Sequence, residues 1–149
     1  MSKVHAIYFC INILLKVIIP LICFEFNYVI VMKKVYYLKT CSTCKRILKE
    51  LNLSSDFYLQ DIKSEEITAK QLEEMKNLSG SYEALFSKKA KLYKEMSLKN
   101  QNLEERDYRH YILDHYTFLS RPVIIINDQI FIGNSKKTVE SIKQFLNKN

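Results

Sequence analysis

The chain has 149 residues, of which 48% are hydrophobic and only two are glycines and two prolines, and this suits one domain with one buried core. Its net charge of +7 comes from lysines and arginines scattered among acidic residues. This spread argues against direct nucleic-acid binding, which needs a concentrated basic patch. Four cysteines in a helix-rich chain do not make a secreted scaffold held by disulfides.

The first 31 residues are strongly apolar. Lys16, Pro20 and Glu25 interrupt the apolar run, so that its longest uncharged stretches are shorter than the ~20 residues needed to span a bilayer. A signal peptide would need a small-residue cleavage site, which this segment lacks. A membrane helix and a signal peptide both stay open as alternatives. We expect the domain to start at Met32, with residues 1–31 as an apolar extension outside the fold.

The charges on either side of this extension bear on where the domain resides. Only Lys3 precedes the apolar run, whereas Lys33, Lys34 and Lys39 follow it. If the extension entered a membrane, the positive-inside rule would leave the main domain in the cytoplasm. We therefore expect a cytoplasmic domain that contacts a membrane only through residues 1–31.

The first half of the domain is predicted to be a β-α-β unit. Residues 35–38 form a short β-branched and aromatic run typical of a strand, and residues 45–51 favour a helix. Residues 56–61 alternate as a second strand. A strand, a helix and a strand in this order favour a parallel pair of strands.

A three-helix insert is predicted over about residues 66–117. Thr68 and Gln71 have capping-box spacing and open the first helix, Ser81 can cap a second, and the third runs over about 103–116. The residues expected on the inward face are Tyr82, Leu85, Phe86, Lys89, Tyr93 and Met96 in the second helix and Tyr108, Tyr111, Ile112 and either His115 or Tyr116 in the third.

The C-terminal part is predicted to be a β-hairpin followed by a helix. Residues 122–126 and 129–132 read as antiparallel strands joined by a two-residue turn at Asn127 and Asp128. Ser135 can cap a terminal amphipathic helix. The predicted fold is therefore α/β, with the order β-α-β, three-helix insert, β-β-α and a mixed four-stranded sheet.

Cys41 and Cys44 form a Cys-x-x-Cys motif between the first strand and the first helix. Because a helix N-terminus favours a thiolate, Cys41 is predicted to be the nucleophile, and Cys44, one turn further on, to be the resolving thiol. Half a zinc site and two merely packed cysteines stay open as alternatives. His110 and His115 are five residues apart, which does not place both rings on one helix face, and we expect no metal.

A second element supports a thioredoxin-like fold: Ser120-Arg121-Pro122 directly precedes the third strand. In such folds a cis-proline at this place faces the cysteine turn, although the sequence alone does not say whether Pro122 is cis. The combined motifs resemble the arsenate-reductase-related (ArsC/Spx) family over nearly all of residues 32–149. They are the runs at residues 41–46, 82–87, 91–93, 118–123 and 132–133.

The resemblance implies roles for several residues. Cys41 would be the redox cysteine, and Arg121 would supply positive charge near its thiolate or near a bound oxyanion; a surface arginine at a strand entrance is the open alternative. We assign substrate binding to Thr43, Lys45, Lys88 and Pro122. No cofactor is expected, and glutathione or thioredoxin would be the reductant.

The resemblance also predicts poor arsenate reduction. Arsenate reductases of this type use three arginines around the arsenylated cysteine, and this chain matches only one. Ser87, followed by Lys88 and Lys89, stands where the insert arginine would fall, and residues 133–137 stand where the last would fall. Lysines lack the fork geometry with which arginine clamps two oxygens.

The predicted function is therefore a cytoplasmic thiol oxidoreductase of the arsenate reductase-like family. Its substrate would be a small thiol, a disulfide or an oxyanion. A protein redox partner is a further expected ligand, and the chain is expected to be a monomer. The alternative is a non-enzymatic, Spx-like redox-responsive regulator or binding protein, whose affinity for a protein partner depends on oxidation of Cys41 and Cys44. Turnover with a reductant separates the two.

Overall fold

A computed structural model describes residues 32–148, so the predictions for residues 1–31 lie outside the described residues. Its sheet has four strands in the order β2-β1-β3-β4. Strand β1 (Lys33–Tyr37) pairs in parallel with β2 (Tyr58–Asp61) and antiparallel with β3 (Val123–Ile126), which pairs antiparallel with β4 (Gln129–Ile132). The predicted α/β fold with a mixed four-stranded sheet is confirmed.

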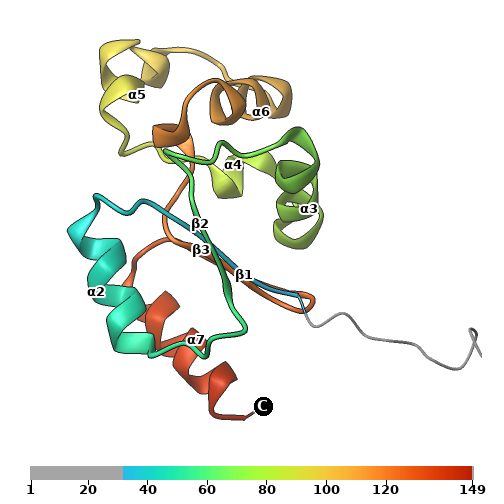
Figure 1. Cartoon of the computed structure of the whole chain (residues 1–149). Helices are drawn as coiled ribbons and strands as arrows, with labels where there is room; N and C mark the ends of the chain where they lie inside the picture. Colours follow the sequence, from blue (N-terminus) through green and yellow to red (C-terminus); the bar gives the residue numbers. More distant parts are fainter. Residues whose placement is uncertain (1–31, 149) are drawn as a thin grey trace, which may run out of the picture. The chain divides into compact units, whose positions relative to one another are not determined.

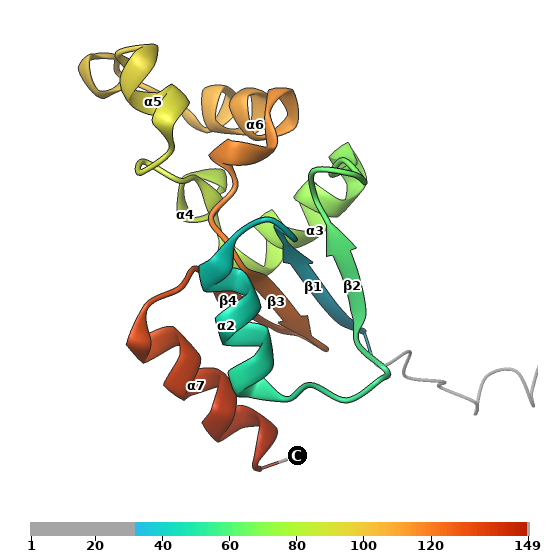
Figure 2. The same ribbon diagram turned by 60° about the vertical axis from the view of Figure 1, so that its left-hand side comes forward.

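Two helices pack side by side on one face of the sheet (Figures 1 and 2). They are α2 (Ser42–Leu51), which joins β1 to β2, and α7 (Lys136–Leu146), which ends the chain. Alternate residues of each strand point to this face, so that Val35 and Ile124 are buried beneath the helices. Ser135 caps α7 as predicted: its hydroxyl accepts a hydrogen bond from the Thr138 N–H at 3.0 Å.

The insert between β2 and β3 packs on the opposite face and beyond one end of the sheet (Figures 1 and 2). Its elements are α3 (Ala69–Ser79), α4 (Tyr82–Leu85), α5 (Lys91–Glu95), the 3-10 helix η1 (Leu98–Asn100), α6 (Glu105–Asp114) and the 3-10 helix η2 (Tyr116–Phe118). The predicted capping box is present, because the Gln71 N–H donates to the Thr68 hydroxyl and the Thr68 N–H donates to the Gln71 side chain.

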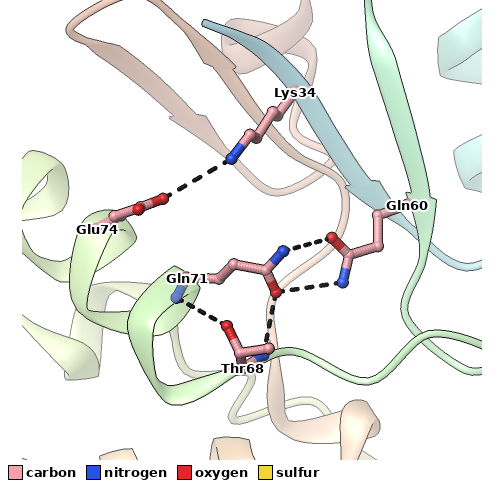
Figure 3. A network of polar contacts seen from close by, with 5 residues as sticks. All are labelled: Lys34, Gln60, Thr68, Gln71 and Glu74. Carbon is pink, nitrogen blue, oxygen red and sulfur yellow. Dashed lines mark hydrogen bonds and ion pairs between the residues drawn. The ribbon is translucent and has the colours of Figure 1, made fainter.

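A polar network fastens α3 to the sheet (Figure 3). Gln60 on β2 is 1% exposed, and its side-chain amide exchanges two hydrogen bonds with that of Gln71, at 2.9 and 3.3 Å. Lys34 on β1 forms an ion pair with Glu74 at 3.9 Å. Since a buried amide is costly to leave unpaired, the Gln60 pair fixes where the insert begins on the sheet.

The prediction of one continuous second insert helix is wrong. Helix α4 ends at Leu85, and Phe86 takes an extended backbone that forms an antiparallel bridge with Leu119. The Ser87 N–H donates to the Phe118 carbonyl at 2.7 Å, and the Ser120 N–H donates to the Leu85 carbonyl at 2.8 Å. These long-range backbone bonds outweigh local helix propensity, which is only a weak preference.

The break redirects the residues that follow it. Helical structure resumes at Lys91, where α5 begins. Met96, which was predicted to face inward, is 44% exposed. The third helix, α6, ends at Asp114, before the predicted end, because His115 takes an extended backbone and η2 begins. Tyr108 and Ile112 are buried as predicted.

Candidate active site

Cys41 occupies the N-cap position of α2, with an extended backbone, directly after the turn that leaves β1. Its N–H donates to the Leu38 carbonyl at 2.9 Å, and its carbonyl accepts the first helical hydrogen bond, from Lys45 at 3.1 Å. Both cysteines of the motif are free thiols; Cys41 is half-buried and Cys44 is 1% exposed. The helix start therefore presents Cys41 outward and draws Cys44 into the interior.

The surroundings of Cys41 favour its thiolate. Partial burial would raise the pKa of the Cys41 thiol, but hydrogen bonds from the Cys44 N–H, the Cys44 thiol and the Thr43 N–H outweigh burial, and the positive charge of Arg121 adds to them. Together they lower the pKa of Cys41 below that of an ordinary cysteine. The N–H donors belong to the first turn of α2, where they have no partner within the helix.

Cys44 is shifted in the opposite direction. Burial raises the pKa of the Cys44 thiol, and so do its hydrogen bond to Cys41 and the charge on Cys41, whereas a backbone hydrogen bond with Leu38 and the charge of Arg121 act against the rise. Cys44 therefore keeps its proton where Cys41 loses it. This separation suits an attacking thiolate and a thiol held in reserve.

Arg121 lies in the loop that leads into β3, and the Arg121-Pro122 peptide bond is cis. Pro122 is buried and Arg121 half-buried. The guanidinium Nη1 donates to the Tyr116 carbonyl at 3.2 Å, so that η2 holds the side chain from the insert side. Arg121 acts electrostatically on both cysteines.

Cys41 and Arg121 open into one cavity of about 760 Å³. The cavity lies among the start of α2, the broken α4–α5 segment, the loop before β3 and the loop between β4 and α7. Its remaining lining residues are Ser81, Glu83, Ala84, Phe86, Ser87, Lys88, Lys89, Ala90, Ser120, Ile132, Gly133, Asn134 and Ser135. The space is large enough for a small organic ligand.

Of the predicted site residues, the structure brings Cys41, Lys88 and Arg121 to this cavity. Thr43, Lys45 and Pro122 are not among its lining residues. Thr43 reaches Cys41 through its backbone N–H, Lys45 is exposed on α2, and the Pro122 carbonyl accepts a hydrogen bond from the Gly133 N–H at 2.9 Å.

Several polar lining residues were not predicted as site residues. They are Ser81, Glu83, Ser87, Lys89, Ser120, Asn134 and Ser135. Most belong to the segments in which the family's other two arginines would fall, or to the motif runs around residues 82–87 and 118–123. The positions of the motifs could therefore have indicated that these residues line the site. Their residue types alone gave no indication of a catalytic or binding role.

The described residues give no sign of a metal centre or a membrane span. Within residues 32–148, no three His, Cys, Asp or Glu side chains are grouped so that they could hold a metal ion. None of the helices in the same range is long and apolar enough to cross a bilayer.

Removing the charge of Arg121 should make Cys41 less acidic. We expect Arg121→Ala to raise the pKa of Cys41, because a half-buried cation favours a nearby thiolate. The measurement is the pH dependence of Cys41 alkylation by iodoacetamide in the full chain, followed at residues 40–45 by mass spectrometry. Arg46→Ala is the matched control, since Arg46 lies on α2 but pairs with Glu50. Equal changes in the pKa of Cys41 in both variants would show that Arg121 has no specific effect on the Cys41 thiolate.

Comparison with known proteins agrees with this architecture. Residues 36–142 match the model of the ArsC family. The fold is similar to that of an arsenate reductase from Vibrio cholerae, with a TM-score of 0.63 and 21% identity over 75% of this chain and 98% of that one. It is also similar to an arsenate reductase (ArsC) related protein from Brucella melitensis, with a TM-score of 0.57, 19% identity and coverages of 75% and 94%.

A third similar structure, a protein from Staphylococcus aureus, has a TM-score of 0.59 and 25% identity over 74% of this chain and 97% of that one. A search of curated proteins found no match. The family model begins within β1 and spans the other three strands, both motif cysteines, the insert and Arg121. The chain belongs to the ArsC family, which is thioredoxin-like.

Proposed function

We propose that this chain is a thiol oxidoreductase in which Cys41 is the nucleophile and Cys44 the resolving thiol. The observation that carries the proposal is that the pKa values of the two thiols shift in opposite directions: the pKa of Cys41 is lowered and that of Cys44 is raised. In addition, Cys41 lines the cavity and Cys44 does not. A thiolate exposed to a ligand-sized space beside a buried partner is what disulfide exchange requires.

The reaction on a disulfide is a two-electron exchange. The Cys41 thiolate attacks one sulfur of the substrate, forms a mixed disulfide and expels the other half as a thiolate. Cys44 then loses its proton, attacks the Cys41 sulfur and releases the second half, which leaves a Cys41–Cys44 disulfide and a reduced substrate. Glutathione or thioredoxin would supply the two electrons that restore both thiols. Arg121 and the N–H groups that begin α2 would stabilise the negative charge at Cys41 in each step.

Small disulfides and glutathionylated thiols suit the cavity better than arsenate does. Arg121 is the single arginine among the described residues that line it, and the other cations are Lys88 and Lys89. Because lysine cannot grip two oxygens of an oxyanion in a planar fork, arsenate would be held less firmly than by three arginines. We propose a cytoplasmic monomer served by a protein or small-thiol reductant, since the cytoplasm maintains the reducing thiol pool that the reaction would need.

Turnover is the direct test. The full chain is supplied with a substrate, either a small disulfide or arsenate, and with an electron donor, either glutathione or thioredoxin. The matching reductase and NADPH keep the donor reduced, and the consumption of NADPH is measured. We expect steady turnover of the disulfide and at most slow turnover of arsenate. No turnover with either donor would contradict the proposal.

A redox-responsive binding protein is the second candidate. The hydrogen bond between the Cys41 and Cys44 side chains also favours it, since the same pair could close a disulfide that changes a binding surface instead of a substrate. Oxidation-dependent binding to a protein partner without turnover would favour this alternative.

A further inference from the structure

The cavity beside Cys41 is not uniformly basic. Lys88, Lys89 and Arg121 line it together with one carboxylate, that of Glu83. Glu83 Oε1 accepts a hydrogen bond from Lys88 Nζ at 2.6 Å and one from the Tyr108 hydroxyl at 3.4 Å. One of the three cations is therefore already neutralised.

The position of Lys88 is also restrained from a second side. Its Nζ lies 5.9 Å from the centroid of the Tyr108 ring, within the range of a cation-π contact. Glu83 and Tyr108 thus hold the ammonium group at one wall of the cavity. Both members of the Glu83–Lys88 pair have half-exposed side chains, so that the restraint is modest and its effect should be graded rather than absolute.

We propose that Glu83 is a specificity-determining residue that, by holding Lys88, reduces the positive charge offered to a substrate at Cys41. The site then selects neutral or singly charged disulfides over multiply charged oxyanions. This deepens the proposed function and rests on it in one respect, that Cys41 is the reacting group.

Charge selectivity at Cys41 can be measured with two alkylating reagents of similar size. The Cys41 thiolate displaces iodide from either iodoacetamide, which is neutral, or iodoacetate, which carries one negative charge. Because both reagents react with the same thiolate, the ratio of their rate constants cancels any change in its pKa and reports the local charge. The rates are followed at residues 40–45 of the full chain by mass spectrometry.

We expect Glu83→Gln to raise the iodoacetate-to-iodoacetamide ratio by about two- to fivefold at low ionic strength, as Lys88 becomes free to face the reagent. The increase should largely disappear at about 1 M salt, where charges are screened beyond about 3 Å. In a Lys88→Gln background the same Glu83 substitution should raise the ratio by a smaller factor, since only the loss of the Glu83 charge then acts on the reagent and no cation is released.

Glu95→Gln is the matched control. Glu95 forms an ion pair with Lys91 at 3.3 Å in the neighbouring helix α5, and neither residue lines the cavity. An unchanged ratio in Glu83→Gln, an equal rise in Glu95→Gln, or a full rise without Lys88 would each overturn the proposal. A failure of the proposed function would give a different result. The pH dependence of alkylation by iodoacetamide would then give an ordinary cysteine pKa for Cys41, while the ratio of the two reagents' rate constants could still be measured.

Discussion

Replacing Cys41 by serine should abolish disulfide reduction, lowering the turnover rate by at least about a thousandfold. A serine hydroxyl is not ionised near neutral pH, so that the N–H donors of α2 and the charge of Arg121 have no anion to stabilise at this position. The fold should be unaffected, because Cys41 is only half-buried and oxygen replaces sulfur with little change of shape. The measurement is the coupled NADPH assay, with a thermal melt to confirm folding.

Cys44→Ser should give a different result, and the contrast separates the two roles. Without the resolving thiol, the mixed disulfide on Cys41 should accumulate, and mass spectrometry should find one substrate half per chain. Serines in place of Cys10 and Cys23 in every variant would leave the motif thiols as the only reactive ones. If Cys41→Ser kept its turnover, or if the adduct formed on Cys44, the assignment of the nucleophile would be wrong.

The cysteine turn could be predicted because its chemistry depends on local sequence. A β-branched run, two cysteines three positions apart and a helix-favouring segment place Cys41 at a helix N-terminus whatever the rest of the chain does. The hairpin was equally local, since Asn127 and Asp128 separate two apolar runs and Asn127 adopts the positive φ of 57° that such a turn needs.

The part of the cavity lining that comes from the broken α4–α5 segment could not be predicted in the same way. The break after Leu85 exists because Phe86 pairs with Leu119, a residue far along the chain, and no local signal marks it. With the helix interrupted, Ser87, Lys88 and Lys89 line the cavity instead of continuing along a helix face. The motif resemblance located this segment, but only the long-range pairing explains why its side chains meet Cys41 and Arg121.

The same pairing gives the largest expected stability effect, at Phe118. This residue is 1% exposed, and its ring stacks on Phe86 with a centroid distance of 5.2 Å and an interplanar angle of 12°. Tyr111 adds a second aromatic contact, at 5.4 Å. Phe118 therefore links α6 to the broken α4–α5 segment.

We expect Phe118→Ala to lower the free energy of unfolding by about 3–5 kcal/mol, because a buried ring is lost and a cavity is left between rigid neighbours. This is a large part of the 5–15 kcal/mol typical of a domain. Urea unfolding of the full chain measures it, with Met96→Ala as control, since Met96 belongs to the same insert but is 44% exposed and should cost less than about 0.5 kcal/mol. Similar losses in both variants would mean that the aromatic stack does not hold the insert.

A selective loss of stability in Phe118→Ala would link the stability of the domain to the contact that forms part of the cavity lining. The Phe118 carbonyl accepts a hydrogen bond from the Ser87 N–H and so fixes the backbone next to Lys88. The rate at which Cys41 reacts with iodoacetate should therefore also change in this variant.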